Sequence, residues 1–457
     1  MGHGIEDVVA RGMCIGCGGC SVRTSGAIPV VLGRYGMYEA DLEGVASEHI
    51  AAGDQVCPFS DSAESEDQLS DSRFGQLPVD RRLGRHRSIF AGRIADDEQI
   101  IESSSGGLTS WFLGELLSRE MVDGVIHVGR GETDQLFGYT ISDSVSALVA
   151  SRKSMYYSTA LADTLLAVRG NGKTYAVVGV PCFIKAVRLL ANDDPRFDRQ
   201  FPWFVGLVCG HMKSQFFAES LAWQAGVPPA DLESIDFRVK NPARRSYAYD
   251  YEVRSRRGFS RLRRVHATVD GNWAYGAFQP GACNFCDDVF AETADVVFGD
   301  AWLPQFTGDW RGTNVVVTRN DAADGILLDG AARRQIHLES LSADDAARSQ
   351  AGNFRHRRDG LRVRLADDVA AGLSVPRKRV TPGYDGLTDV RIGLIRQRRL
   401  MSELSSRVFA EARRRGKLRI YTKPMRAAIL RYRQIESPGM SLRRRTMDSL
   451  RTRLSLR

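Results

Sequence analysis

Three cysteines stand within seven residues near the start of the chain, in the stretch CIGCGGC at residues 14–20. Cys14, Cys17 and Cys20 lie too close together along the chain to pair as disulfides of good geometry. They suit a small object on which several thiolates converge, and the three glycines between them let the backbone turn around it. An iron–sulfur cluster is such an object, so this stretch predicts one.

The three cysteines lack a local fourth ligand. Bacterial ferredoxins use the spacing C-x2-C-x2-C-x3-C-P, but Thr24 stands where the fourth cysteine would be. The next cysteine along the chain is Cys57, followed by Pro58, and we predict that it completes the set. Zinc is the alternative, although structural zinc sites usually use paired C-x2-C units rather than a string of three cysteines.

From about residue 88 the sequence alternates between apolar, strand-like segments and amphipathic, helix-like segments. The order strand, helix, strand over residues 173–210 is a βαβ unit, so its two strands should be parallel in an α/β fold. We expect helices at residues 108–120, 182–191 and 322–334, and strands at residues 122–129, 173–180, 203–210, 294–300 and 313–320.

The remaining four cysteines are far apart in sequence, but the predicted fold brings them together. Cys182 and Cys209 each follow a strand of the βαβ unit, and parallel neighbours place their carboxyl ends at one edge of a sheet, where ligands bind. Cys283 and Cys286, in GACNFC, add a C-x2-C pair from a loop. We therefore predict a second, all-cysteine site. The alternatives are inert buried cysteines at 182 and 209, and half a zinc site or a redox pair at 283 and 286.

The stretch SSSGG at residues 103–107 precedes a predicted helix. Such a turn favours a phosphate or pyrophosphate, since free amides and the helix dipole point at it. The alternative is an ordinary N-cap by Ser104 or Ser105. Iron–sulfur clusters carry single electrons, and an enzyme that joins them to hydride chemistry needs a converter such as a flavin. We therefore expect the pyrophosphate of FAD at this turn.

Charge is distributed unevenly along the chain. Residues 391–457 hold 20 Lys and Arg against four Asp and Glu, whereas the net charge of the whole chain is +8. A mildly acidic body thus carries a basic tail, which we expect to bind an acidic partner such as ferredoxin or an anionic membrane surface. The alternative is a solvated extension or a contact in a homo-oligomer. No nucleic-acid-binding signature accompanies the tail, so we expect no nucleic acid partner.

Neither a signal peptide nor an apolar run of about 20 residues, the length that spans a bilayer, is visible in the sequence. The hydrophobic content of 43% is that of a globular protein, and eight cysteines are too few for a disulfide scaffold of this length. We expect a cytoplasmic protein, peripheral at the membrane if the basic tail binds lipid.

Taken in order, seven motifs resemble the coenzyme F-420 hydrogenase/dehydrogenase beta-subunit family, which includes 7-hydroxymethyl chlorophyll a reductase. The motifs are CIGCGGC with the distant Cys-Pro, SSSGG, VVGVPCF, LVCGH, SIDFRVK, GACNFC and ADVVFGDAW. The resemblance covers roughly residues 10–335. It implies FAD, two 4Fe-4S clusters, coenzyme F-420 as a co-substrate, and electron exchange with a ferredoxin or another electron carrier.

The resemblance also implies the site residues. The metal ligands would be Cys14, Cys17, Cys20, Cys57, Cys182, Cys209, Cys283 and Cys286. The flavin-binding residues would be Ser104, Ser105, Gly106, Gly107, Lys153 and Asp300. Two departures from the family pattern stand out: Met155 replaces the lysine of the family's S-K-Y stretch, so that Lys153 is the nearest substitute, and the family's C-H-G order is Cys209-Gly210-His211 here.

Three residues are the candidate catalytic groups. We predict that His211 is a proton donor and that Lys153 and Asp300 make polar contacts near the flavin, with Arg238 and Lys240 as further candidates. Surface or structural ion pairing is the alternative for the charged residues among them.

The predicted fold class is α/β, with a mixed or parallel sheet in the flavin domain, an N-terminal ferredoxin-like iron–sulfur segment and a helical basic C-terminal tail. The predicted domains are an N-terminal iron–sulfur segment at 1–62, a linker at 63–87, an N-terminal beta-subunit-type α/β region at 88–170, a C-terminal beta-subunit-type flavin and iron–sulfur domain at 171–340, a connecting segment at 341–384 and the basic tail at 385–457.

The predicted function is an oxidoreductase. It would pass electrons between a one-electron carrier and FAD, for two-electron reduction or oxidation of coenzyme F-420 or another small organic substrate. The alternatives are a non-catalytic electron-transfer subunit of a larger complex and a zinc-stabilised binding protein.

Overall fold

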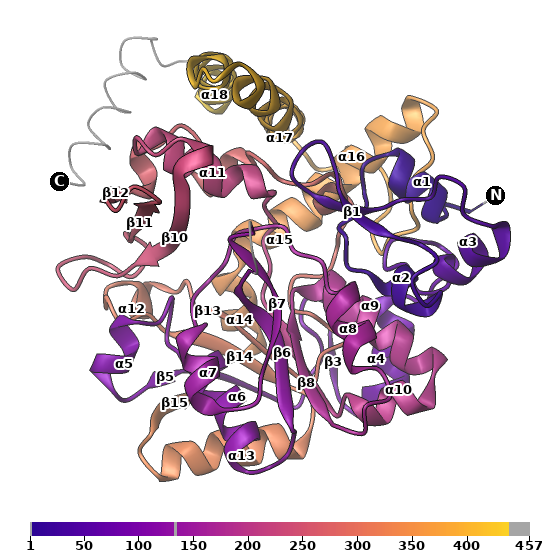
Figure 1. Ribbon diagram of the computed structural model, residues 1–457, viewed down its shortest axis with the longest axis vertical. Helices are drawn as coiled ribbons and strands as arrows, with labels where there is room; N and C mark the ends of the chain where they lie inside the picture. Colours follow the sequence, from indigo (N-terminus) through magenta and orange to yellow (C-terminus); the bar gives the residue numbers. More distant parts are fainter. Residues whose placement is uncertain (1, 132–134, 438–457) are drawn as a thin grey trace.

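An eight-stranded mixed sheet forms the centre of the chain in the computed structural model, which describes residues 2–131 and 135–437 (Figure 1). The strand order is β15-β5-β14-β13-β9-β8-β6-β7. These strands are β5 (Ser88–Ile94), β6 (Gly124–Arg130), β7 (Phe137–Ser142), β8 (Tyr175–Gly179), β9 (Trp203–Leu207), β13 (Val296–Asp300), β14 (Asn314–Thr318) and β15 (Ile336–Ser340).

The middle of the sheet is parallel. β8 runs parallel to both β6 and β9, and β13 runs parallel to β9. The outer strands β7, β14, β5 and β15 are joined by antiparallel pairings. Ala176 pairs with Trp203, and Gly179 pairs with Gly206. The predicted parallel βαβ unit is therefore confirmed, and the α/β class takes the form of a mixed sheet.

Helices cover both faces of the sheet, because successive strand residues point to opposite sides. Ala176 and Val178 of β8 pack among residues of α6 and α13, whereas Val177 packs among residues of α9, α14 and α16. All three helices predicted from the sequence of this region are confirmed. The helices of the two layers are α6 (Leu108–Ser118) and α13 (Asp321–Ala332) on one face, and α9 (Pro181–Asp193), α14 (Ala343–Ser349) and α16 (Asp359–Ala370) on the other.

The N-terminal segment packs on the α9 face of the sheet, where its apolar residues join the same core as α9. Figure 1 shows it in indigo, beside α9 and α16. Its elements are α1 (Ile5–Ala10), α2 (Gly19–Arg23), β1 (Val30–Leu32), β2 (Tyr38–Ala40) and α3 (Ser47–Asp54). The helices that complete this part of the chain are α5 (Asp97–Ile101), α7 (Val145–Ala150), α8 (Ala162–Val168), α10 (Pro195–Gln200), α12 (Pro304–Thr307) and α15 (Ala351–Arg357).

The predicted linker at residues 63–87 contains a helix, α4 (Glu66–Phe74), followed by the short strands β3 (Val79–Asp80) and β4 (Gly84–Arg85). The helix begins at a capping box. Ser65 Oγ accepts a hydrogen bond from Gln68 N at 3.2 Å, and Ser65 N donates to Gln68 Oε1 at 2.8 Å. The polar composition of this segment favoured a linker, although the S-x-x-Q pattern of Ser65 and Gln68 is typical of a helix start.

A second core lies beyond the sheet. A three-stranded sheet, in the order β10-β11-β12, packs with α11 and with the hairpin of α17 and α18. The predicted basic tail thus includes two long helices whose inner sides are buried, and residues 438–457 of it lie outside the described residues. The elements are α11 (Gln215–Gln224), β10 (Leu232–Val239), β11 (Asp250–Ser255), β12 (Ser260–Arg264), α17 (Asp389–Arg415), α18 (Arg419–Glu436) and the 3-10 helices η1 (Pro229–Asp231), η2 (Val265–Ala267), η3 (Trp273–Tyr275) and η4 (Gly281–Asn284).

Phe409 is the anchor of the α17–α18 hairpin. It is fully buried, and its ring centroid lies 5.2 Å from that of Phe216 and 5.2 Å from that of Tyr421. We expect Phe409→Ala to lower the free energy of unfolding by about 3–5 kcal/mol, because it leaves a cavity among these rings. Leu400→Ala on the same helix is the control, since Leu400 is 50% exposed. Equal urea midpoints for the two variants would contradict the packing described here.

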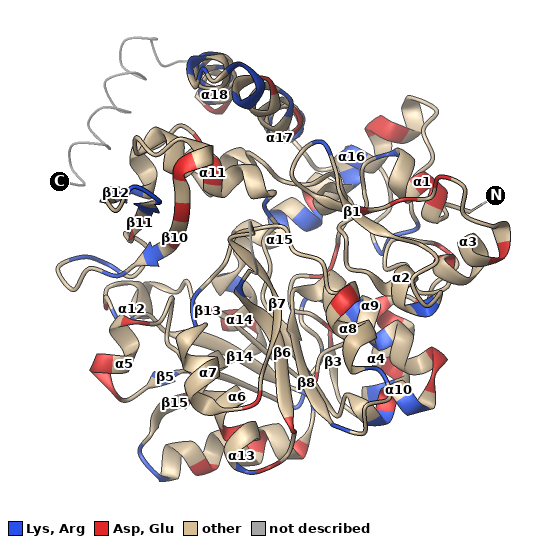
Figure 2. Cartoon of the chain, viewed as in Figure 1, with Lys and Arg blue, Asp and Glu red and all other residues tan. Residues whose placement is uncertain are grey.

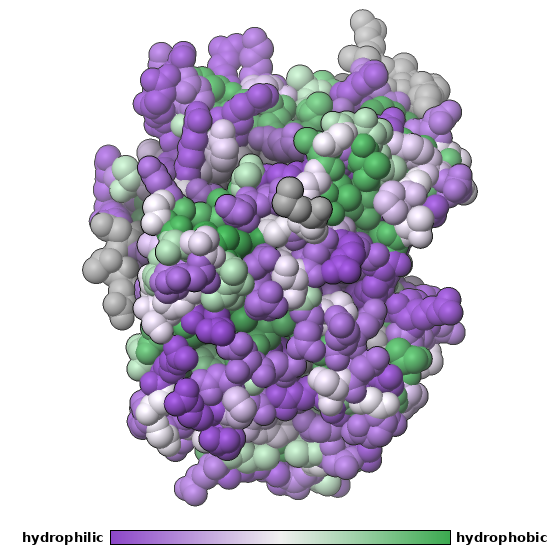
Figure 3. Space-filling model, turned by 90° about the vertical axis from the view of Figure 1, so that its right-hand side faces the viewer, coloured by the Kyte–Doolittle hydropathy of each residue, from purple (hydrophilic) through white to green (hydrophobic). Residues whose placement is uncertain are grey.

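Basic residues are frequent on the helices and strands of the second core (Figure 2). Figure 2 shows Lys and Arg along α17 and α18 and on β12. On the face drawn in Figure 3, hydrophilic residues predominate, with smaller groups of apolar residues between them. No helix in the described ranges combines the length and the apolar character needed to span a membrane.

Candidate functional site

The first four cysteines meet at the start of α2. Cys14, Cys17 and Cys20 lie on the loop and first turn of this helix, and Cys57 follows α3. All four line one small cavity, which they share with Pro58. The structure therefore brings the CIGCGGC triad together with the distant Cys-Pro, and we call these residues the first group.

Glycine is required in this loop. Gly16 and Gly18 have φ angles of +66° and +80°. A Cβ on Gly16 would lie 2.2 Å from Cβ of Tyr38, and a Cβ on Gly18 would lie 2.6 Å from Cβ of Ala162. The loop is thus held closely between β2 and α8, in a conformation that other residues rarely adopt.

The thiolates of the first group need bound positive charge to be stable together. Burial raises the pKa of all four thiols, and neighbouring thiolates raise those of Cys17, Cys20 and Cys57 further. Backbone amides act in the opposite direction, and Ala40 N donates to Cys14 Sγ at 3.2 Å. Four buried thiolates can coexist only if positive charge is bound among them. Four sulfurs with amide hydrogen bonds therefore fit an iron–sulfur cluster.

The other four cysteines meet at the carboxyl edge of the parallel strands. Cys182 follows β8 and Cys209 follows β9, while Cys283 lies on η4 and Cys286 just after it. Burial raises the pKa of Cys182, and the thiolates of the other three raise it further, so the four cysteines are close enough to interact electrostatically. Met212 N donates to Cys283 Sγ at 3.3 Å. We call these cysteines the second group.

The two groups are neighbours. The Cys17 thiolate is among the charges that raise the pKa of Cys182. Burial raises the pKa of Tyr139, and Cys182 and Cys17 both add to the rise, so the Tyr139 hydroxyl lies near both groups. It donates to Val178 O at 3.3 Å, and its ring stacks on Phe183 at 5.8 Å. Sequence reasoning missed Tyr139, because no motif marks a tyrosine on an outer strand.

A single zinc ion fits these groups less well than a cluster. Zinc–sulfur bonds of about 2.3 Å require sulfurs within roughly 4 Å of one another. Within residues 2–131 and 135–437, no three His, Cys, Asp or Glu side chains are arranged so that they could hold one metal ion. A cubane accepts thiols that are farther apart, because its own iron and sulfide atoms lie between them.

The SSSGG turn leads into α6 without a serine cap. Gly107 is the N-cap, with φ of +80° and no side-chain hydrogen bond. Ser104 Oγ instead accepts a hydrogen bond from Ser154 N at 2.7 Å. The alternative interpretation, an N-cap by Ser104 or Ser105, is therefore wrong. The helix N-terminus keeps its positive end for an anion.

Gly106 lies at the closest backbone approach in this turn. A Cβ on Gly106 would meet Asn314 Oδ1 and Gly92 O, each at 2.8 Å. Asn314 Oδ1 also accepts from Leu108 N at 3.1 Å, which fixes the first turn of α6 against the sheet. Sequence reasoning missed Asn314, because its position depends on the pairing of β14 with β5.

Lys240 holds the turn from the other side. Its Nζ donates to the carbonyl oxygens of Ser105 at 2.6 Å and Ile100 at 2.8 Å, and also to that of Arg311. Burial and then the positive charge of Arg238 lower the pKa of Lys240 to about 7. The ammonium group of Lys240 is thus hydrogen-bonded to the backbone of the SSSGG turn.

Arg238 and Lys153 bring two more cations to this place. Arg238 Nη1 lies 2.9 Å from Asp300 Oδ2, and its Nη2 lies 3.3 Å from Asp300 Oδ1. Lys153 Nζ lies 2.9 Å from Asp236 Oδ2. Arg238 Nε is buried and has no hydrogen-bond partner among the described residues. Arg238 and Lys153 are each paired with a carboxylate, so the positive charge for an anion comes from Lys240 and from the helix N-terminus. Together with the buried N–H of Arg238, these groups fit the pyrophosphate of a dinucleotide.

His211 lies beside the second group. Its Nδ1 lies 3.2 Å from Arg398 Nη2, which can only donate, so the proton of His211 is on Nε2. Burial, with Lys213 and Arg398, lowers the pKa of His211 well below its ordinary value, so the ring is neutral. Its ring centroid lies 4.6 Å from that of Trp273, which in turn lies 4.8 Å from that of Tyr156.

Tyr156 continues this row of rings toward the turn. Burial raises its pKa, Arg238 lowers it and Asp300 raises it, so Tyr156 lies beside that ion pair. The row His211, Trp273, Tyr156 therefore joins the second group to the cations around SSSGG. Sequence reasoning found the second group and the cations but assigned no role to Trp273, which belongs to no motif, or to Tyr156, which was noted only as part of the S-K-Y stretch.

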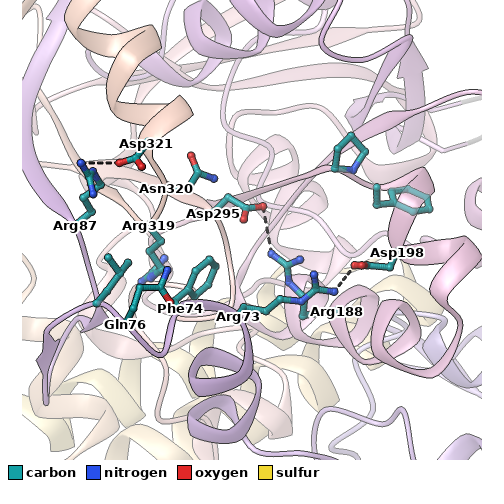
Figure 4. Close-up of a pocket in the computed structure, with 13 residues that line it drawn as sticks. Arg73, Phe74, Gln76, Arg87, Arg188, Asp198, Asp295, Arg319, Asn320 and Asp321 are labelled. Carbon is teal, nitrogen blue, oxygen red and sulfur yellow. Dashed lines mark hydrogen bonds and ion pairs between the residues drawn. The ribbon is translucent and has the colours of Figure 1, made fainter.

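A larger cavity than the one lined by the first group lies elsewhere. A cavity of about 460 Å³ is lined by Pro202 and Asp295, which precede β9 and β13, so it opens at the amino ends of the parallel strands, opposite the cysteines. Figure 4 shows its charges in pairs, with Arg73 on Asp198, Arg188 on Asp295 and Arg87 on Asp321. The fourth arginine of the lining, Arg319, donates to backbone carbonyl oxygens, among them that of Arg85 at 2.7 Å, so the charged groups of this cavity are already engaged within the protein.

Comparison with known proteins agrees with the motifs. The family model described as "Coenzyme F420 hydrogenase/dehydrogenase, beta subunit N-term" matches residues 89–166, and the model of the carboxyl-terminal part of the same beta subunit matches residues 172–344. No curated protein matches the chain. One similar solved structure is described as "Xenon derivatization of the F420-reducing [NiFe] hydrogenase complex from Methanosarcina barkeri"; it is 17% identical, covers 65% of this chain and 98% of its own, and has a TM-score of 0.49. The two family matches together span more than half of the sequence, and this chain belongs to the coenzyme F420 hydrogenase/dehydrogenase beta-subunit family.

Proposed function

We propose that this chain is a flavin- and iron–sulfur-dependent oxidoreductase. It would exchange electrons with a one-electron carrier of the ferredoxin type and reduce or oxidise coenzyme F-420 or another organic substrate by two electrons. The observation that carries the proposal is the arrangement of all eight cysteines in two adjacent groups of four. Family membership supports the general role in redox electron transfer.

Each part of the site has a proposed occupant. The first and second groups would each hold a 4Fe-4S cluster, and the SSSGG turn would hold the pyrophosphate of FAD. When bound, the clusters supply one-electron transfer and FAD converts between one- and two-electron chemistry. The residues proposed to hold FAD are Ser104, Ser105, Gly106 and Gly107 by their backbone, and Lys153, Arg238 and Lys240 by charge.

Asp300 and His211 have different proposed roles. Asp300 fixes Arg238 through two hydrogen bonds and so aims the unpaired Nε of that guanidinium. His211 holds a proton on Nε2, which also has no hydrogen-bond partner among the described residues. The neutral ring can therefore donate a hydrogen bond to a substrate through this N–H, and the adjacent Arg398 disfavours the imidazolium that would be needed to release a proton readily.

The basic hairpin supplies a docking surface in this proposal. Long helices with exposed arginines suit an acidic electron carrier, which they would attract over a distance of about 10 Å at moderate salt. An anionic membrane surface is the second proposed partner, through the same charges, for a protein that works in the cytoplasm.

Lys240 gives the proposed FAD site a pH dependence. Its pKa of about 7 in the free site means that the ammonium group loses its proton as pH rises through 7. A bound pyrophosphate favours the charged form, so FAD affinity should be level below pH 7 and fall by up to about tenfold per pH unit above it. We expect Lys240→Met to weaken FAD binding and to remove this slope, as measured by equilibrium dialysis. Lys173→Met, at an exposed lysine, should keep it; a slope that survives in Lys240→Met would refute the assignment.

The proposed catalytic role is tested with the isolated chain. After anaerobic loading with iron, sulfide and FAD, the chain is mixed with reduced coenzyme F-420 and a one-electron viologen acceptor. The proposal predicts turnover that needs both FAD and iron. Clusters that accept electrons from separately reduced viologen, in a chain that oxidises neither coenzyme F-420 nor other hydride donors, would instead favour a non-catalytic electron-transfer subunit.

A further inference from the structure

Arg357, at the end of α15, is buried beside the second group. It is 1% exposed, and its Nη2 donates to the carbonyl oxygens of Cys209 at 2.9 Å and Gly210 at 3.1 Å. Its Nε and Nη1 are also buried, and neither has a hydrogen-bond partner in the part of the chain that the structure describes. Two nitrogen atoms of a buried cation, which carry three N–H groups, are thus left without an acceptor among the described residues.

A buried guanidinium needs negative charge close by, because the loss of its hydration is otherwise unfavourable. Burial disfavours the charged form of Arg357, but the thiolates of Cys286, Cys209 and Cys283 raise its pKa above the ordinary value. The same guanidinium lowers the pKa of each of these thiols against the effect of burial. The charges that complement Arg357 are therefore those of the second group.

Two further arginines, the buried Arg364 and the half-buried Arg398, strengthen this positive surrounding. Arg364 Nε donates at 2.7 Å to the carbonyl oxygen of Asn284, which lies between Cys283 and Cys286 in the chain. Arg398 contacts His211, and its Nε is buried without a partner among the described residues. All three arginines lie beyond residue 344, where the family match ends. The segment that follows the family match therefore places positively charged side chains near the second group.

The first group has a different surrounding. Burial raises the pKa of Cys14 and Cys57, and the carboxylates of Glu39 and Asp54, respectively, add to the rise. The charges named here beside the first group are therefore negative. Beside the second group, Arg357 affects the pKa of Cys286 more than either Asp288 or Asp287, whose carboxylates act in the opposite direction.

We infer that Arg357 is the counter-charge of the redox centre held by the second group, and that it raises the reduction potential there above that of the first group. This inference rests on the proposed function. Reduction adds one negative charge to the site, and a guanidinium at short range in a low-dielectric interior stabilises that charge. Arg357 is a positioning residue in this role, since it acts on the centre without exchanging electrons. The resulting difference in potential favours electron flow from the first group to the second.

Redox titration of the loaded, full-length chain, followed by electron paramagnetic resonance, tests this inference. The signal of the second group is identified as the one that Cys286→Ala removes. Arg357→Gln should lower the equilibrium constant for reduction of that signal at least tenfold, which is about 59 mV for one electron. Arg357→Lys should shift it less, because the charge remains while the fork geometry is lost. The signal of the first group should not move.

The controls separate this inference from its premise. Arg355→Gln removes the same charge from an exposed position on the same helix and should shift neither signal. If Arg357→Gln fails to load, Arg398→Gln and Arg357→Lys still report the effect of charge, each with a smaller negative shift. Loaded variants whose potentials equal that of the unmodified chain would overturn the inference alone. An unmodified chain that binds no iron would overturn the proposed function and the inference together.

Discussion

Cys17→Ala should halve the iron content of the chain, from about eight to about four atoms, while FAD remains bound. Cys17 belongs to the first group, and its thiolate also raises the pKa of Cys182 in the second group. Its loss removes a proposed ligand of the first cluster, through which electrons would pass to the second. We expect turnover with a ferredoxin-type carrier to fall by about 100-fold or more, equal to about 2.7 kcal/mol in the barrier.

Thr24→Ala is the matched control for this variant. Thr24 stands where bacterial ferredoxins have their fourth cysteine, but its hydroxyl donates to Cys20 O at 2.8 Å. The control should therefore keep all its iron, whereas Cys57→Ala should behave as Cys17→Ala does. Full iron content in Cys57→Ala, or loss of iron in Thr24→Ala, would show that the fourth ligand has been misplaced.

Gly106→Ala should abolish most FAD binding. The added Cβ would lie 2.8 Å from Gly92 O and from Asn314 Oδ1, and 2.9 Å from Asn314 N. Backbone atoms of the sheet cannot move away cheaply, so the SSSGG turn itself must shift from the N-terminus of α6. We expect FAD affinity to fall by about 100-fold, or about 2.7 kcal/mol, in equilibrium dialysis.

Gly325→Ala provides the comparison for that experiment. Gly325 lies within α13, and a Cβ there would meet no atom within 4 Å. The same addition of a methyl group should leave FAD affinity unchanged and stabilise the helix slightly. If Gly106→Ala binds FAD as tightly as Gly325→Ala does, the flavin does not lie on the SSSGG turn.

The central sheet and the cysteine groups followed from patterns that act over short ranges. Apolar runs predicted the strands, and the rule that neighbouring parallel strands end at the same edge placed Cys182 beside Cys209 from the sequence alone. The fourth position of the first group could be assigned to Cys57 because the local pattern ended at Thr24. In each case the residue type and its spacing are compatible with few other structures.

The rest of the site depends on contacts between segments far apart in sequence. Lys240, which directly follows β10, bonds Ser105 O only because the end of β10 lies near the SSSGG turn. Asn314 bonds Leu108 N because the pairing of β14 with β5 places it beside the start of α6. The arginines near the second group looked like part of a charged extension, since composition does not distinguish a buried guanidinium from a solvated one. The helix α4 was missed for a related reason: its buried side consists of only a few residues, among them Leu69.

The count of iron, acid-labile sulfide and FAD per chain, in protein purified without oxygen, tests the central claim most directly. Two 4Fe-4S clusters and one flavin predict about eight iron atoms, about eight sulfides and one FAD, with a brown colour and broad visible absorbance. A colourless chain that carries stoichiometric zinc and no flavin would contradict the account.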